Sequence, residues 1–187
     1  QGVGLGTGDA DDRLFDDEGI VIYCSTFSKI LSAGMRVGFV IAPDTVASKM
    51  VVSKQTSDVH TNLFFQILCY RYMTECDLDG HIRDIQKIYG HKCSLMLDCL
   101  DRELPKSVKF TRPEGGLFIW GTLPDKIDAT EFIKKASERN VRVVPGAAFN
   151  CDTDAPSNSF RLNYSTPSDD QIVTGIRVLG ELAREMG

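Results

Sequence analysis

The sequence lacks the long apolar segments and the positive charge that would suggest a membrane or nucleic-acid partner. Its 187 residues contain no apolar run approaching the ~20 residues that span a bilayer, and no charged-then-apolar signal peptide is recognisable at the start. The 21 Lys and Arg residues are outnumbered by 26 Asp and Glu residues, giving a net charge of −5. Because nucleic-acid-binding surfaces carry excess positive charge, we expect neither partner for this chain.

Cysteine and histidine do not occur in the patterns typical of disulfide scaffolds or metal sites. The six cysteines are scattered and none forms a CxxC pair, which argues against a disulfide framework. The three histidines, His60, His81 and His91, show no HExxH or other paired-ligand spacing, so no metal site is expected. The thiols are therefore predicted to be reduced and the protein to be cytoplasmic.

The composition is that of a globular protein, with 42% hydrophobic and 25% charged residues. Glycines and aspartates crowd residues 1–18, which predicts a flexible tail. Beyond the tail, strands and helices mix around a long helix, which indicates an α/β layer structure. The segment 62–70 is apolar nearly all round and predicts a buried helix. Strands are predicted over 20–23, 37–42, 108–111, 117–122, 141–144 and 160–164. Helices are predicted from 46, capped by Asp44 or Thr45, to the polar interval 53–61, and over 62–70, 82–104, 128–138 and 168–186. Asp128 with Glu131 and Ser168 with Gln171 are expected to cap the last two, and Asn140 to end the 128–138 helix in a left-handed conformation.

The chain's chemistry is concentrated in residues 19–43, where two apolar strand candidates flank a polar segment. Thr26 and Ser28 are separated by one residue, so both hydroxyls are expected on the same side of an extended segment. Lys29 follows directly, and Arg36 lies seven residues beyond it. Hydroxyls and an arginine suit a phosphate, and a lysine amine can attack a carbonyl. We therefore expect Lys29 to hold a cofactor through a Schiff base.

A serine–lysine nucleophile of the penicillin-binding type is a competing interpretation of the same lysine. That pattern, SxxK, requires a serine three residues before the lysine, where this chain has Thr26. The accompanying SDN and KTG motifs are also absent from the sequence. This interpretation is therefore rejected.

Four segments in order resemble the fold-type I, pyridoxal-phosphate-dependent aminotransferases of class I and II. Residues 24–43 read CSTFSKILSAGMRVGFVIAP and are similar to that family's S/T-x-S-K-x-x-x-x-G-x-R-x-G lysine segment. Residues 112–124 and 141–149 read RPEGGLFIWGTLP and VRVVPGAAF and resemble its P-x-G-G-x-F-x-W strand and V-x-V-x-P-G-x-x-F loop. Residues 159–165, SFRLNYS, resemble the strand whose arginine binds the substrate carboxylate. The kynurenine/2-aminoadipate aminotransferase branch is the most similar.

This resemblance implies a role for each matched residue. Lys29 would form the Schiff base with pyridoxal 5′-phosphate and move the proton of the reaction. Thr26, Ser28 and Arg36 would bind the cofactor phosphate. Arg161 would pair with the substrate α-carboxylate, a role that suits a planar guanidinium. The implied reaction is transamination between an L-amino acid (aromatic, 2-aminoadipate-like or of broad specificity) and a 2-oxo acid such as 2-oxoglutarate, in a homodimer.

The resemblance also implies how the chain is divided. Residues 1–75 would be the tail of the large cofactor-binding domain, and residues 76–187 would be the small C-terminal α/β domain. In this family the aspartate at the pyridine nitrogen, the tyrosine at the 3′-oxygen and the aromatic residue on the cofactor ring lie upstream of the lysine. Residues 1–28 offer no counterpart to them. The parent protein is therefore expected to transaminate and this chain alone to be inactive.

Two further interpretations remain open. Some bacterial transcription regulators carry an aminotransferase-like domain behind a winged-helix domain, so the chain could be a cofactor-binding regulatory module. It could also be a structural fragment that binds no cofactor. A helix-turn-helix upstream would favour the first, and a titration without cofactor uptake would favour the second. The substrate is not specified, because Arg161 implies only that a carboxylate is recognised.

Overall fold

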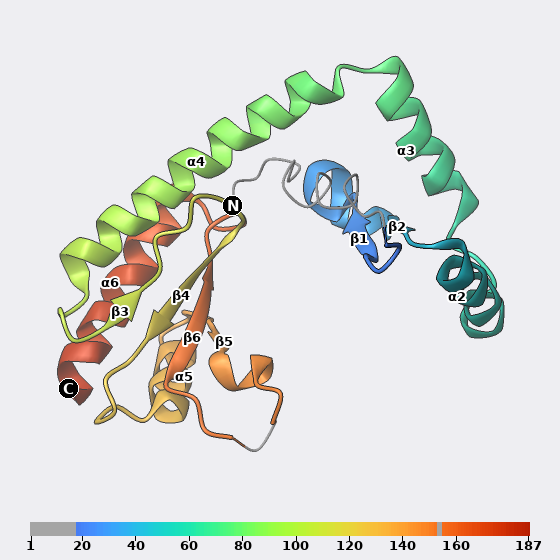
Figure 1. Cartoon of the computed structure of the whole chain (residues 1–187). Coiled ribbons are helices and arrows are strands. Elements are labelled where there is room, and N and C mark those ends of the chain that lie inside the picture. Colours follow the sequence, from blue (N-terminus) through green and yellow to red (C-terminus); the bar gives the residue numbers. More distant parts are fainter. Residues whose placement is uncertain (1–17, 153–154) are drawn as a thin grey trace. The chain divides into compact units, whose positions relative to one another are not determined.

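The computed structural model describes residues 18–152 and 155–187. The described residues divide into two compact units, a first unit that ends at Ile85 and a second unit over Gln86–Gly187 (Figure 1). The long helix α4 (Leu78–Glu103) contributes residues to both units. The expectation of a flexible tail concerns residues that, apart from Glu18, lie outside the described part of the chain.

The first unit opens with an antiparallel hairpin around the lysine segment. Strand β1 (Tyr23–Thr26) pairs with β2 (Gly38–Ile41), and between them run a π-helical turn, η1 (Ser28–Ser32), and a 3-10 turn, η2 (Ala33–Met35). The predicted strand over 20–23 is wrong except for its last residue. Strand structure begins only at Tyr23 because that is where pairing with β2 begins.

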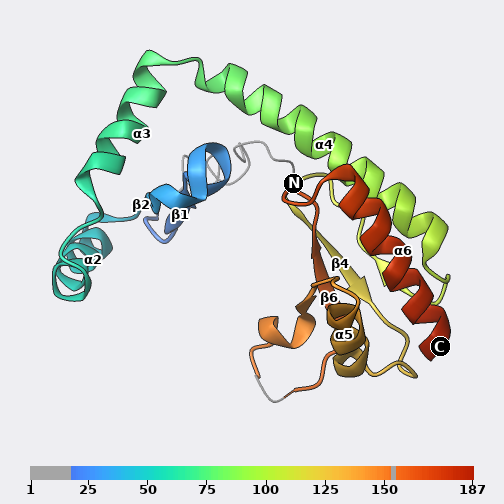
Figure 2. The same ribbon diagram turned by 180° about the vertical axis from the view of Figure 1, so that it is seen from behind.

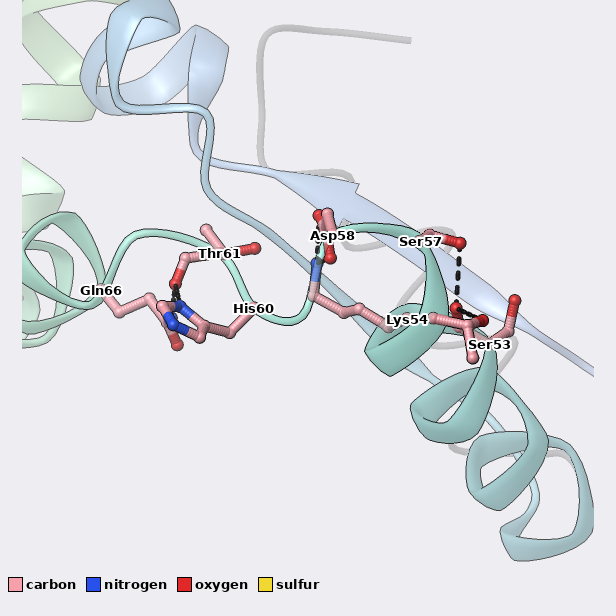
Figure 3. Close-up of polar contacts among 8 residues, drawn as sticks. Ser53, Lys54, Ser57, Asp58, His60, Thr61 and Gln66 are labelled. Atoms are coloured by element: carbon pink, nitrogen blue, oxygen red, sulfur yellow. Dashed lines mark hydrogen bonds and ion pairs between the residues drawn. The ribbon is translucent and has the colours of Figure 1, made fainter.

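Helix α2 (Asp44–Ser57) begins earlier and ends later than the sequence predicts. Asp44 lies in its first turn, and Pro43 takes the cap position without a side-chain hydrogen bond. The polar residues of its last turn extend it, since the Ser57 hydroxyl donates to the Ser53 carbonyl at 2.9 Å (Figure 3). The Lys54 amine also binds the Asp58 carboxylate at 2.9 Å just beyond the helix end. The polar interval that was predicted to separate two helices therefore belongs in part to the first of them.

Helix α3 (Leu63–Glu75) contradicts the prediction of a buried helix. Leu63, Phe64 and Tyr70 are 62%, 68% and 64% exposed, and within α3, which is described throughout, only Cys69 is buried. The apolar residues point in all directions around the helix, and no described segment covers most of them. The small core here joins the buried residues Met35, Val37 and Cys69 to the partly buried Phe27, Leu31 and Phe65.

The second unit is built on an antiparallel sheet whose described strands follow the order β3-β4-β6-β5. Of the strand predicted over 141–144, only Val144 is in a strand, β5 (Val144–Pro145). The Val141 amide donates to the Ala136 carbonyl at the end of a helix and not to a neighbouring strand. Asn140 has the predicted left-handed conformation, with φ at 61°. The strands are β3 (Lys109–Phe110), β4 (Phe118–Thr122), β5 (Val144–Pro145) and β6 (Ser159–Asn163).

Helices α5 (Ala129–Glu138) and α6 (Asp169–Met186) join α4 in covering one face of this sheet. Both begin at predicted caps: Asp128 accepts from two backbone amides, and Ser168 forms a capping box with Gln171. In Figure 2, α4 and α6 run side by side over the sheet. The core that they close joins Leu100, Phe132 and Leu179 from the helices to Ile119, Phe160 and Leu162 from the strands.

Side chains of β4 and β6 alternate between the two faces of the sheet, and the described helices α4, α5 and α6 cover only one of these faces. Ile119 pairs with Leu162 on the covered face, whereas Trp120 pairs with Arg161 on the opposite face. The predicted α/β class is confirmed. No helix among the described residues is long and apolar enough to cross a membrane.

Candidate cofactor and substrate site

The Thr26 and Ser28 hydroxyls lie together at the end of β1, with their oxygens 2.8 Å apart. They meet through a turn, because Phe27 between them has helical dihedral angles of −81° and −1°. The prediction of an extended segment at this point is therefore wrong. The turn forms because Thr26 Oγ1 accepts from the Ser28 amide at 3.1 Å, a local bond typical of threonine at turns.

A single carbonyl joins this turn to the arginine segment. Val37, the residue after Arg36, accepts from the Thr26 hydroxyl at 3.2 Å and from the Phe27 amide at 3.0 Å. Because Thr26 gives its only hydroxyl proton to Val37, Ser28 is the donor in the bond between the two hydroxyls. Gly38 allows β2 to approach β1 this closely, since a Cβ at Gly38 would lie 2.8 Å from the Ser25 carbonyl oxygen.

Arg36 is exposed at the rim of this cluster. Its backbone is left-handed, with φ at 53°, a conformation that is uncommon outside glycine and indicates a constrained position. Its guanidinium donates through Nη1 to the Ala33 carbonyl at 3.2 Å. The remaining guanidinium donors face away from that bond and can pair with an anion.

Lys29 lies in the π-helical turn η1 directly after Ser28. Its side chain is exposed, and among residues 18–152 and 155–187 its amine has no hydrogen-bond or ion-pair partner. The next residue, Ile30, is buried, and its carbonyl contacts His81 Nε2 at 2.8 Å. The lysine is thus presented outward from a turn that is tied down on its inner side.

Arg161 is held between two aromatic rings on the open face of the second unit's sheet. Its guanidinium carbon lies 4.0 Å from the centre of the Phe118 ring and 4.6 Å from that of Phe149. Trp120 packs edge-on against Phe149 with ring centres 5.5 Å apart. Arg161 Nε is buried without a hydrogen-bond partner. Since a buried unpaired donor costs about 1–3 kcal/mol, this atom is a ready partner for a carboxylate.

The glycine turn before β4 is anchored to the segment after β6. The Tyr164 hydroxyl donates to the Gly116 carbonyl at 2.6 Å, and Gly116 has a φ of 86° that side-chain-bearing residues rarely adopt. Burial raises the pKa of Tyr164 well above its ordinary value, and the neighbouring Cys93 thiol adds to that shift. Burial likewise raises the pKa of the Cys93 thiol, against a smaller opposite effect of its hydrogen bond with Tyr164.

The structure gathers the predicted residues into two groups. Those proposed for the cofactor lie on one hairpin of the first unit, whereas Arg161 lies in the second unit. The sequence motifs did not indicate the ring contacts that Phe118 and Phe149 make with Arg161. The spacing of Phe118 and Trp120 on one strand was the available signal, because it puts both on the face opposite Ile119.

The donors on the hairpin fit a phosphate monoester. Two clustered hydroxyls and an exposed guanidinium supply the donors that such a group accepts, and Lys29, the residue after Ser28, carries an exposed amine. The orphaned donor of Arg161, with its plane fixed by two rings, fits a planar carboxylate. The hairpin thus suits a phosphorylated carbonyl cofactor, and Arg161, in its own unit, suits a carboxylate substrate.

Comparison with known proteins agrees with this chemistry. An aromatic-amino-acid aminotransferase of Thermococcus litoralis is 39% identical over 173 residues, which cover 92% of this chain and 41% of that protein. A 2-aminoadipate transaminase of Thermus thermophilus is 39% identical over 160 residues, covering 86% of this chain and 40% of that protein. The crystal structure of a kynurenine aminotransferase from Pyrococcus horikoshii superimposes with a TM-score of 0.85 at 41% identity, covering 90% of this chain and 42% of that one.

These matches confirm the resemblance carried by the lysine segment and by the three later motifs. The chain spans 41% and 40% of the lengths of the two curated relatives. Residues 1–179 match the family model described as aminotransferase class I and II. The chain therefore belongs to the class I and II aminotransferase family.

Proposed function

We propose that the parent protein of this chain is a pyridoxal 5′-phosphate-dependent aminotransferase. It would transfer an amino group between an L-amino acid and a 2-oxo acid such as 2-oxoglutarate. The observation that carries this proposal is the free Lys29 amine beside the paired hydroxyls of Thr26 and Ser28, in a chain of this family. The names of its relatives favour an aromatic or 2-aminoadipate-like amino acid.

The hairpin residues would bind the cofactor phosphate. Ser28 can turn its hydroxyl proton from Thr26 toward a phosphate oxygen at little cost, because a hydroxyl rotates freely. Arg36 would add charge-assisted hydrogen bonds from the guanidinium donors that the Ala33 carbonyl leaves unused. Thr26 would bind the same anion by turning its hydroxyl proton away from the Val37 carbonyl, while its oxygen would still accept the Ser28 amide that closes the turn.

Lys29 would attach the cofactor through a Schiff base and then serve as the proton carrier. The bound cofactor supplies an electron sink that eases removal of the proton next to the substrate amine. Once displaced by the substrate amine, the Lys29 amine would be free to take that proton and return it to the carbonyl-derived carbon of the cofactor, so that the amino group would stay with the cofactor. A short turn suits this role, because the rigid backbone leaves only the flexible side chain to move.

Arg161 would hold the substrate by its α-carboxylate. The Phe118 and Phe149 rings fix the guanidinium plane, so little side-chain entropy is lost when the carboxylate binds. Buried Nε and one terminal nitrogen would then form two parallel hydrogen bonds. We also propose, from the family resemblance, that the parent protein works as a cytoplasmic homodimer and that this chain alone is inactive.

The proposal is tested on the full-length parent protein incubated with pyridoxal 5′-phosphate. Wild-type protein should develop Schiff-base absorbance, and Lys29→Ala should lose it. Lys49→Ala, which removes an exposed lysine of α2 in the same unit, should keep it. An unchanged band in Lys29→Ala would contradict the assignment. A normal band without amino transfer to 2-oxoglutarate would favour the regulatory module instead.

A further inference from the structure

One histidine contacts the lysine turn from a distant part of the sequence. His81 Nε2 lies 2.8 Å from the carbonyl oxygen of Ile30, 51 residues earlier in the chain. A carbonyl oxygen can only accept a hydrogen bond, so Nε2 must carry the proton in this contact. The residue that receives this bond directly follows Lys29.

The surroundings of His81 hold its ring in place. His81 is half-buried at the start of α4, where its amide donates to the Asp77 carbonyl at 3.1 Å. Its ring packs edge-on against Tyr72 of α3, with ring centres 5.7 Å apart. The next residue, Ile82, is buried. Two helices therefore aim one donor at the lysine turn.

The turn that receives this bond has an uncommon backbone geometry. η1 is a π-helical segment of five residues, Ser28–Ser32, and π-helical turns are rare and occur mostly as single turns at functional sites. Its entry is closed by a bond from the Leu31 amide to the Phe27 carbonyl at 2.8 Å. His81 adds a bond from the opposite side, at the residue next to the lysine.

We propose that His81 is a positioning residue that fixes the backbone beneath Lys29. The proposal rests on the function proposed above for Lys29. Without the donor, the Ile30 carbonyl loses its link to α4 and the turn can shift. A displacement of about 1 Å at a reacting group costs about 100-fold in rate, so a small movement of the turn would lower kcat. Substrate binding through Arg161 would be little affected.

Three variants separate the hydrogen bond from the ring. His81→Phe keeps an aromatic ring against Tyr72 but has no donor, whereas His81→Gln supplies a side-chain N–H of similar reach. His60→Phe is the matched control, because His60 lies exposed in the same unit and its Nδ1 contacts only the neighbouring Thr61 carbonyl, at 3.0 Å (Figure 3).

The first measurement is hydrogen exchange of residues 28–35 in the full-length parent without cofactor. In His81→Phe the backbone amides of this segment should exchange about tenfold faster than in the wild type, as expected for the loss of one hydrogen bond. His81→Gln and His60→Phe should exchange at the wild-type rate. Wild-type exchange in His81→Phe would overturn the proposal, because no support would have been lost.

The second measurement is steady-state kinetics of the same proteins with cofactor. His81→Phe should lower kcat by about 10- to 100-fold with KM within about twofold, and His81→Gln should recover most of the rate. If Lys29→Ala keeps its Schiff-base absorbance, the proposed function itself fails. If that test succeeds but His81→Phe has wild-type kcat, only the positioning proposal fails.

A third measurement needs no variant and covers the case in which His81→Phe does not fold. The tautomer of His81 is read by nitrogen NMR of the wild-type parent protein. The proposal requires the proton on Nε2. A neutral ring protonated only on Nδ1 would overturn it, because such a ring cannot donate to the Ile30 carbonyl.

Discussion

At the scale of single residues, Arg161 is held by its neighbours in a way that lysine could not reproduce. A guanidinium stacks flat between rings and offers parallel donors, whereas an ammonium is a compact point charge. In the parent protein, Arg161→Lys should therefore lower kcat/KM by about 100-fold, mostly through a higher KM. Steady-state kinetics with an aromatic amino acid measures this. Arg142→Lys, at an exposed arginine of the same unit, is the control, and an equal kcat/KM for both variants would contradict the role of Arg161.

Tyr164 makes the second unit sensitive to alkaline pH. Its pKa is raised in the folded state, so the folded protein holds its proton where the unfolded chain has lost it. The stabilisation is complete below the ordinary pKa of about 10 and declines as pH rises above it. Urea denaturation between about pH 8 and 11 should show this decline.

The variant Tyr164→Phe removes the titrating group and should flatten that alkaline decline. It also loses the bond to Gly116, so its free energy of unfolding at neutral pH should fall by about 1 kcal/mol. Tyr70→Phe, at an exposed tyrosine, provides the comparison. An identical alkaline decline in wild type and Tyr164→Phe would exclude Tyr164 as its source.

At the scale of elements, two glycines differ sharply in the space around them. A Cβ at Gly121 of β4 would overlap the Phe160 ring, whereas nothing lies within 4 Å of a Cβ at Gly90 of α4. Gly121→Ala should lower the free energy of unfolding by about 1–3 kcal/mol through overpacking. Gly90→Ala should raise it by about 0.5–1 kcal/mol, because alanine favours the helix. Urea denaturation of both variants checks the pair, and a stabilising Gly121→Ala would contradict the packing.

Caps and periodic patterns predicted the elements of the second unit well. Asp128, Ser168 and Asn140 were placed correctly because their effect is local. Predictions failed where a distant partner decides the outcome. The apolar residues 20–22 do not pair with β2, and Val141 bonds to a helix end instead of a strand. No local pattern contains the position of a pairing strand.

For the candidate site too, the sequence indicated what depends on neighbouring residues and not what depends on distant ones. The lysine motif indicated Thr26, Ser28 and Arg36, because short-range spacing groups them. It could not show that Phe27 makes a turn between the hydroxyls, or that His81 supports that turn from 51 residues away. The His81 contact depends on how α3 and α4 fold back within the first unit.

At the scale of the whole molecule, the two units differ in how much core they bury. The second unit encloses large side chains such as Phe132, Phe160 and Tyr164 completely, whereas α3 leaves Phe64 and Tyr70 more than half exposed. Since burial supplies about 25 cal/mol per Å² of apolar surface, the second unit should be the more stable of the two.

Hydrogen exchange of the chain in rising urea would show that difference. The amides of residues 86–187 should stay protected from exchange at urea concentrations at which the amides of residues 18–85 have already lost their protection. Simultaneous loss of protection in both ranges would contradict it and indicate a single cooperative structure.

Pyridoxal 5′-phosphate is proposed to attach to a single lysine, Lys29, and the point of attachment can be located directly. The cofactor-loaded parent protein is treated with borohydride, which reduces a Schiff base to a stable amine, and its peptides are then mapped by mass spectrometry. The pyridoxyl phosphate mass is expected on the peptide that contains Lys29 and should be absent in Lys29→Ala. Label on another lysine, or no label on any peptide, would contradict it.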